Sequence, residues 1–298
     1  MTPALARLAA LRLILATLTA CGGSASPPPP GLRVVTTTTV LADLVQQVGG
    51  DRVILTALVP KGGEVHTFDP RPSDIVAVTN ARLVFLNGLG LDPWAERLAG
   101  DSGSSATVVR LGELVAEERR IVENGRPNPH LWLDVANAID YVEAIAAALT
   151  EADPAGGSEY RAARDLYVER LRALDAEVRD RLAAVPEANR VVVSFHDAFP
   201  YFARAYGLRV VGTVVKAPGQ DPSAGDVAAL IDKIRRTGAR AVLAEAQFSA
   251  DLARTIAGET GATVVADLYT DSLGDPPAAT YEGIVRGDVE RIVAALGG

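Results

Sequence analysis

Short apolar runs rich in β-branched residues alternate with segments of helical spacing along most of the chain. Four runs lie in the first half, at 32–40, 53–59, 83–88 and 107–111, and four in the second, at 190–195, 209–215, 241–246 and 263–268. The segments between them, such as 41–48 and 222–236, carry apolar residues at steps of three and four. This alternation predicts parallel sheets covered by helices on both faces. Because the runs form two sets, we expect an α/β protein with two similar lobes.

A single apolar stripe runs through the segment between the two sets of strands. Its members follow one another at steps of three or four residues: Tyr160, Ala163, Tyr167, Leu171, Leu174, Val178 and Leu182. The stripe predicts one long helix that starts near Ser158 and ends before Pro186. A helix of about 27 residues is roughly 40 Å long. We interpret it as a rigid connection that restricts hinge motion between the lobes, although a surface helix within one domain would show the same stripe.

The amino terminus has the pattern of a secretory signal peptide. Arg7 and Arg12 are followed by an apolar run at 13–20 that is too short to span a bilayer. The tetrapeptide LTAC at 18–21 resembles the lipobox of bacterial lipoproteins, and Cys21 is the single cysteine of the chain. We therefore expect cleavage before Cys21 and lipidation of its thiol, with an ordinary signal peptide and a chance cysteine as the alternative. The Gly/Ser/Pro-rich stretch after it predicts a tether.

These patterns divide the chain into five segments. They are a signal peptide at 1–20, the lipidated cysteine and Pro-rich tether at 21–31, a first α/β lobe at 32–152, the connecting long helix at 153–186 and a second α/β lobe at 187–298. The chain has a formal net charge of −8 and no extended basic run after the signal. Nucleic acid is therefore not expected as a partner.

The chain has only three histidines, and each lies in a loop of a kind that carries binding sites. His66 lies in "PKGGEVHTFDPRPSD" after the run 53–59, and His130 lies in "NPHLWLD" before a helix expected from about Val135. His196 lies at the carboxyl end of the run 190–195, where open α/β sheets bind ligands. Imidazole suits Zn, Cu, Fe and Ni, but the spacing matches no compact metal motif. From the residues alone, the three histidines could form a metal site, or each could be a solvated or helix-capping residue.

The segments around the histidines resemble motifs of a known family. The four segments "GEVHTFDPRPSD", "NPHLWLD", "SFHDAFPYF" and "LYTDSLGD" follow one another in order, and the similarity extends over nearly the whole chain after the signal. They are similar to motifs of the cluster A solute-binding proteins of zinc and manganese ABC importers. The resemblance implies that His66, His130, His196 and Asp271 ligate the metal, in a cleft between the lobes.

The resemblance also implies a function and its partners. We expect an extracytoplasmic, monomeric lipoprotein, anchored to the membrane through Cys21, that captures a divalent metal and delivers it to an ABC permease. Manganese members often carry glutamate where His196 stands, so the ligand set here favours Zn²⁺ as the transported ion, with Mn²⁺ as the alternative. Many zinc-specific members carry a long His- and acid-rich loop before the second ligand, whereas the interval "ELVAEERRIVENGRPNP" is short and free of histidine.

Three acidic residues are candidate partners for the second ring nitrogens of the ligands. Asp197, Glu245 and Asp267 could each accept a ring N–H, and each could also be a solvated or structural carboxylate. We further expect Asp271 and His196 to belong to the same lobe, so that small lobe shifts and loop movement release the metal.

Two other functional classes remain open at this point. A secreted zinc hydrolase would place water where Asp271 ligates, but no general base or nucleophile motif stands out, so we expect no enzyme. A cell-adhesion protein would bind a partner independently of the histidines.

Overall fold

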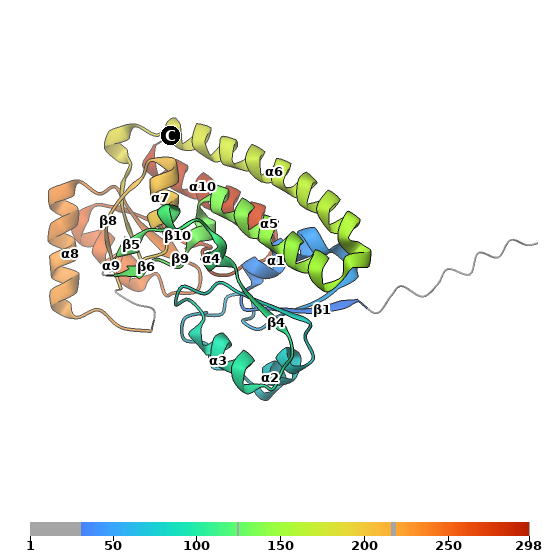
Figure 1. Cartoon of the computed structure of the whole chain (residues 1–298). Helices are drawn as coiled ribbons and strands as arrows, with labels where there is room; N and C mark the ends of the chain where they lie inside the picture. Colours follow the sequence, from blue (N-terminus) through green and yellow to red (C-terminus); the bar gives the residue numbers. More distant parts are fainter. Residues whose placement is uncertain (1–30, 124, 216–218, 298) are drawn as a thin grey trace, which may run out of the picture. The chain divides into compact units, whose positions relative to one another are not determined.

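The computed structural model describes residues 31–123, 125–215 and 219–297 (Figure 1). The predicted signal peptide, Cys21 and the tether up to Pro30 lie outside these residues. Among the described residues, no helix is both long enough and apolar enough to cross a membrane.

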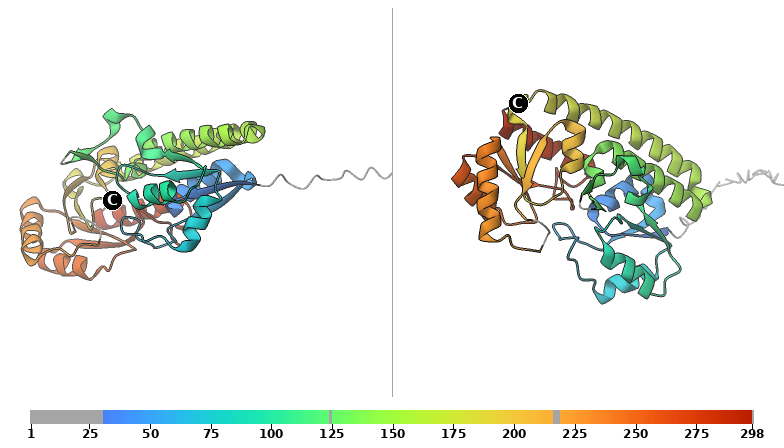
Figure 2. Two further views of the ribbon diagram at one scale, coloured as in Figure 1. Left: turned by 60° about the horizontal axis from the view of Figure 1, so that its bottom comes forward. Right: turned by 60° about the vertical axis from the view of Figure 1, so that its left-hand side comes forward.

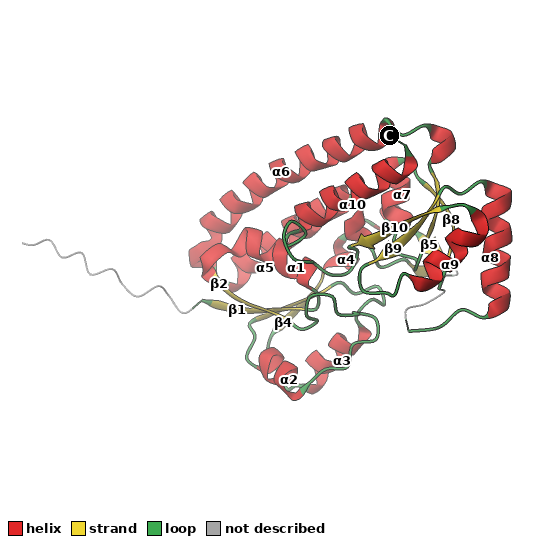
Figure 3. Cartoon of the chain, turned by 180° about the vertical axis from the view of Figure 1, so that it is seen from behind, coloured by secondary structure: helices red, strands yellow, loops and turns green. Residues whose placement is uncertain are grey.

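Two four-stranded parallel sheets form the two halves of the fold, which confirms the predicted α/β class (Figure 3). The first sheet has the order β2-β1-β3-β4, with β1 at Leu32–Thr36, β2 at Val53–Ala57, β3 at Leu83–Leu86 and β4 at Thr107–Arg110. The second has the order β10-β9-β7-β8, with β7 at Val191–Ser194, β8 at Arg209–Thr213, β9 at Ala241–Glu245 and β10 at Thr263–Leu268. We name the halves built on these sheets the first and the second lobe.

Helices follow the strands in both lobes. The first lobe holds α1 (Thr39–Gly49), α2 (Pro72–Thr79), α3 (Pro93–Asp101), α4 (Leu111–Leu114), the 3₁₀ turn η3 (Leu131–Leu133) and α5 (Val135–Ala152). The second lobe holds α7 (Pro200–Tyr206), α8 (Ala224–Thr237), α9 (Asp251–Thr260) and α10 (Tyr281–Leu296). A two-residue hairpin, β5 (Val122–Glu123) with β6 (Arg126–Pro127), precedes η3.

The predicted long helix is α6, Gly157–Ala183, with 27 residues. All members of its apolar stripe are buried except Ala163, which is half-buried. Figure 2 shows α6 running alongside α5 of the first lobe and α10 of the second. Arg170 and Arg286 form ion pairs that join α6 to α10, through Glu282 and Glu177. Because α6 packs on helices of both lobes, it is placed to limit their relative motion.

The first predicted strand, 32–40, is too long. The strand ends at Thr36, because the Thr38 hydroxyl accepts a hydrogen bond from the Leu41 amide at 3.2 Å and caps α1. Threonine favours strands and also caps helices, so a run of four threonines does not show where one element ends and the next begins.

Candidate metal centre

The structure brings His66, His130, His196 and Asp271 together from four separate loops. One ligand atom from each residue lies within 4.8 Å of the others. His66 follows β2, His130 immediately precedes η3, His196 follows β7 and Asp271 follows β10. The site therefore lies near the carboxyl ends of strands from both sheets, which is where open α/β sheets bind ligands.

All three imidazole rings present the same atom, Nε2, to the centre of the cluster. His130 Nε2 lies 3.3 Å from His66 Nε2 and 3.3 Å from His196 Nε2. Asp271 Oδ1 lies 3.5 Å from His130 Nε2, and Oδ2 lies 3.5 Å from His66 Nε2 and 3.4 Å from His196 Nε2. Atoms this close that all carry lone pairs repel one another unless protons or a cation lie between them.

Asp271 has the surroundings of an ionised ligand. Its side chain is fully buried, and apart from the three rings its two oxygens have no hydrogen-bond donor among the described residues. Burial raises its pKa, but the three histidines outweigh burial and hold that pKa well below the ordinary value. A buried carboxylate without donors is costly, and a bound cation would offset that cost.

His130 is oriented by Asn128, two residues earlier. Asn128 Oδ1 accepts a hydrogen bond from the His130 amide at 3.0 Å and lies 3.1 Å from His130 Nδ1. A proton on Nδ1 leaves the Nε2 lone pair free to ligate. No role for Asn128 was predicted from the sequence, although it belongs to the same NPHLWLD motif as His130.

The segment NPHLWLD ends with Asp134, the N-cap residue of α5. Asp134 Oδ1 accepts a hydrogen bond from the Ala136 amide at 3.0 Å and caps the helix, which begins at Val135 as predicted. The Trp132 ring packs beside His130, with 5.5 Å between the ring centroids.

His196 is paired with Glu245, the last residue of β9. Glu245 Oε1 lies 2.9 Å from His196 Nδ1, and both side chains are buried. Burial lowers the pKa of His196, but Glu245 and Asp271 outweigh burial and raise it well above the ordinary value. Of the three predicted acidic partners, Glu245 is therefore the one that lies directly beside a ring nitrogen.

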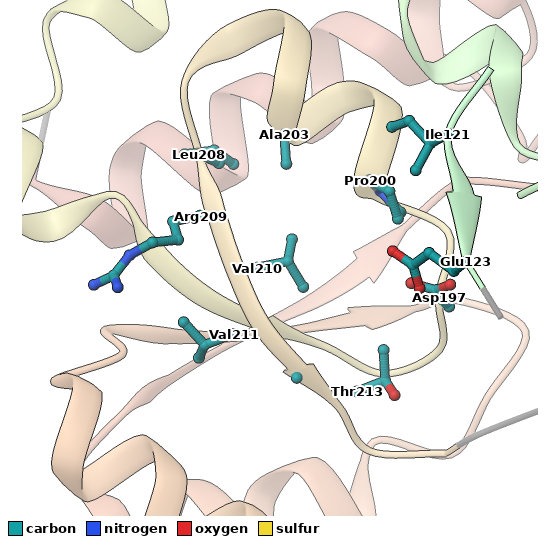
Figure 4. Close-up of a pocket in the computed structure, with 11 residues that line it drawn as sticks. Ile121, Glu123, Asp197, Pro200, Ala203, Leu208, Arg209, Val210, Val211 and Thr213 are labelled. Carbon is teal, nitrogen blue, oxygen red and sulfur yellow. The ribbon is translucent and has the colours of Figure 1, made fainter.

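The other two predicted acidic partners lie elsewhere. The Asp197 carboxylate contacts Asn128 Nδ2 at 3.0 Å, so it supports the His130 ring through that amide. Asp197 lines a pocket of about 720 Å³ beside Glu123 (Figure 4), and burial together with Glu123 raises its pKa to about 6. Asp267 is exposed, and its φ of 59° falls where the pairing of β10 is irregular. The structure therefore does not support a ligand-orienting role for Asp267.

His66 is held by a residue that the sequence analysis missed. Glu64 Oε1 accepts a hydrogen bond from the His66 amide at 2.8 Å. Trp94 Nε1 donates to the carbonyl oxygen of Val65 at 2.8 Å, which fixes the same loop. The His66 side chain is 16% exposed, whereas those of the other three predicted ligands are at most 3% exposed. Of the four predicted ligands, His66 is therefore the nearest to solvent.

Comparison with known proteins gives one family and a set of similar structures. The family model described as zinc-uptake complex component A periplasmic (ZnuA) matches residues 34–295. The manganese-binding lipoprotein MntA of Halalkalibacterium halodurans is 31% identical over 259 residues, covering 86% of each chain. The iron-binding protein YfeA of Yersinia pestis is 32% identical over 261 residues, covering 87% of this chain and 84% of its own.

A solved structure gives the same architecture. The periplasmic zinc-binding protein TroA of Treponema pallidum aligns with a TM-score of 0.83 and 29% identity, covering 89% of this chain and 99% of its own. The names of these three similar proteins mention manganese, iron and zinc. Similarity alone therefore does not select one metal for this chain.

Proposed function

Because this chain belongs to the family of zinc-uptake complex component A periplasmic proteins, we propose that it captures zinc outside the cytoplasm and delivers it to the membrane permease of an ABC importer. The family consists of binding proteins of metal transport and not of enzymes. The observation that carries the proposal is the convergence of three Nε2 atoms and one carboxylate in a mostly buried cluster.

The spacing of the ligand atoms supports zinc as the cargo. Tetrahedral zinc with bonds of about 2.0–2.1 Å separates its ligand atoms by about 3.3–3.4 Å. Four separations among the three Nε2 atoms and Asp271 Oδ2 lie between 3.3 and 3.5 Å. Three imidazoles and one carboxylate are also a ligand set that zinc accepts, and N/O sites bind zinc more tightly than manganese.

Manganese is the second candidate, and one feature of the site favours it. The two Asp271 oxygens face different histidines, so a bidentate carboxylate could raise the coordination number. A larger coordination shell of this kind suits manganese better than zinc.

The anchoring of the protein is also part of the proposal. Similar proteins that are named as lipoproteins include MntA and the metal ABC transporter substrate-binding lipoprotein SsaB of Streptococcus sanguinis. This naming supports lipidation of Cys21, with the Pro-rich stretch as the tether that keeps a monomeric, metal-loaded protein near its permease.

Zinc and manganese titrations test the choice of cargo. The metal-stripped protein is titrated with each ion in competition with a chelator of known affinity. We expect one zinc per chain, bound at least about 100-fold more tightly than manganese, because affinities follow the divalent order at an N/O site. Tighter binding of manganese under the same conditions would overturn zinc as the cargo.

Replacing Asn128 tests how His130 is oriented. Asn128→Ala removes the acceptor of the His130 amide and the partner of Nδ1, so we expect zinc affinity to fall about 10- to 100-fold. Asn128→Asp keeps an acceptor oxygen toward His130 but replaces the amide that donates to Asp197 by a second carboxylate, so it should also weaken zinc binding. Equal zinc affinity in the wild type and Asn128→Ala would show that the ring is fixed by other contacts.

A further inference from the structure

Asp271 follows a strand of the second lobe, yet the residue before it is bound by the first lobe. Trp132 Nε1, in η3, donates a hydrogen bond to the Thr270 carbonyl oxygen at 2.8 Å. Tyr281, where the loop enters α10, donates its hydroxyl to the Trp132 carbonyl oxygen at 2.6 Å. Both aromatic side chains are fully buried, so water does not compete for these bonds.

The residues after Asp271 are also bound by the first lobe. The Leu273 amide donates to Thr39 Oγ1 at 2.8 Å, and Thr39 is the first residue of α1. The Gly62 amide, from the loop after β2, donates to Ser272 Oγ at 2.7 Å. The Thr39 and Ser272 hydroxyl oxygens are 3.3 Å apart. We refer to Thr39, Gly62, Ser272 and Leu273 as the hydroxyl cluster.

The Asp271 side chain itself has little else to hold it. Apart from the three histidine rings, no donor among the described residues binds either of its oxygens. The direction of the carboxylate therefore depends on the backbone to either side, and that backbone is fixed by the hydroxyl cluster and Trp132. Asp271 and His196 both follow strands of the second lobe, but these contacts on either side of Asp271 come from the first lobe.

We propose that Thr39 is a positioning residue for metal binding, and that its hydroxyl, through the Leu273 amide, holds Asp271 in place as the fourth ligand. The inference rests on the proposed function, because it concerns the same site. A loosened loop would let the carboxylate leave the metal more often, so the loss should appear mainly in the dissociation rate. Thr39 itself touches no ligand atom.

A set of Thr39 variants tests this role with Zn²⁺ as the probe, or Mn²⁺ if the wild type prefers it. Thr39→Val replaces the hydroxyl by a methyl group of similar size, and Thr39→Ser keeps the hydroxyl. We expect Thr39→Val to weaken binding about 10- to 100-fold, mostly through faster release, and Thr39→Ser to bind nearly as the wild type does. Ser272→Ala, which removes the acceptor of the Gly62 amide, should weaken binding in the same direction.

A double-mutant cycle separates positioning from a general effect on the fold. In an Asp271→Ala background Thr39→Val should cause no further loss, because the group that it positions is gone. The thermal unfolding midpoint of the metal-stripped Thr39→Val protein should stay close to that of the wild type.

Three results would overturn the role of Thr39. The first is a metal dissociation rate in Thr39→Val equal to that of the wild type. The second is metal binding in Thr39→Ser as weak as in Thr39→Val. The third is a loss of affinity caused by Thr39→Val in the Asp271→Ala background that equals its loss in the wild type. A wild-type protein that binds neither ion would instead overturn the proposed function, and this inference with it.

Discussion

His130→Ala is expected to abolish tight zinc binding, with a loss of roughly 1,000-fold or more, since even the loss of an outer partner of a ligand costs 10- to 100-fold. His130 Nε2 is central to the cluster, at 3.3 Å from the Nε2 atoms of both other histidines and 3.5 Å from Asp271 Oδ1. Zinc titration in competition with a chelator of known affinity gives both the number of zinc ions bound per chain and the loss of affinity in the variant.

Asp267→Asn is a suitable control for this variant. Asp267 lies four residues before Asp271 and was also predicted to take part in the site, but the structure shows it exposed. We expect its removal to leave zinc affinity unchanged within the error of the titration. If His130→Ala bound zinc as tightly as the control does, the four-ligand site would be wrong, and the histidines would return to solvated or capping roles.

The rival functions make different predictions for the same variants. A secreted zinc hydrolase would show zinc-dependent activity on simple esters or peptides that His130→Ala abolishes. An adhesin would keep its partner when all three histidines are replaced. The family model that matches residues 34–295 describes a component of zinc uptake, and this disfavours both the hydrolase and the adhesin.

The fold class could be predicted from the sequence because strands buried on both faces carry continuous apolar runs. The end of β1 could not be predicted, because threonine is favoured both in strands and at helix N-caps. The four candidate ligands were identified through motifs, each local in the sequence. Their spatial convergence is a tertiary property, and spacing alone had left it open.

The supports of the ligands were harder to predict, for a physical reason. Thr39 and Ser272 are 233 positions apart, and no local pattern indicates that their hydroxyls meet. Asp267 lies where the backbone of β10 adopts a φ of 59° and its side chain is exposed, which no local sequence pattern indicates. Asn128 could not be singled out from its type alone, because a neutral amide oxygen can accept a ring N–H as a carboxylate does and asparagine is common in loops.

Trp132→Ala is expected to lower the free energy of unfolding by about 3–5 kcal/mol, the range for removing a large aromatic side chain from a core. Trp132 is 1% exposed. Its indole N–H donates to the Thr270 carbonyl oxygen, and its own carbonyl oxygen accepts from the Tyr281 hydroxyl. The cavity left by the indole would therefore lie between the turn after His130 and the loop that carries Asp271. Denaturant unfolding of the metal-stripped protein measures the loss, and a change below about 1 kcal/mol would contradict close packing at this residue.

Trp132→Phe separates the packing of this residue from its hydrogen bond. The phenyl ring keeps most of the buried apolar surface but cannot donate to the Thr270 carbonyl, so we expect a smaller cost of about 1–3 kcal/mol. Thr270 directly precedes Asp271, so the same variant should also release zinc faster than the wild type. Reduced stability with an unchanged release rate would mean that the hydroxyl cluster alone positions Asp271. Faster release would mean that both flanks of the ligand are required, and that the first lobe holds the carboxylate from either side.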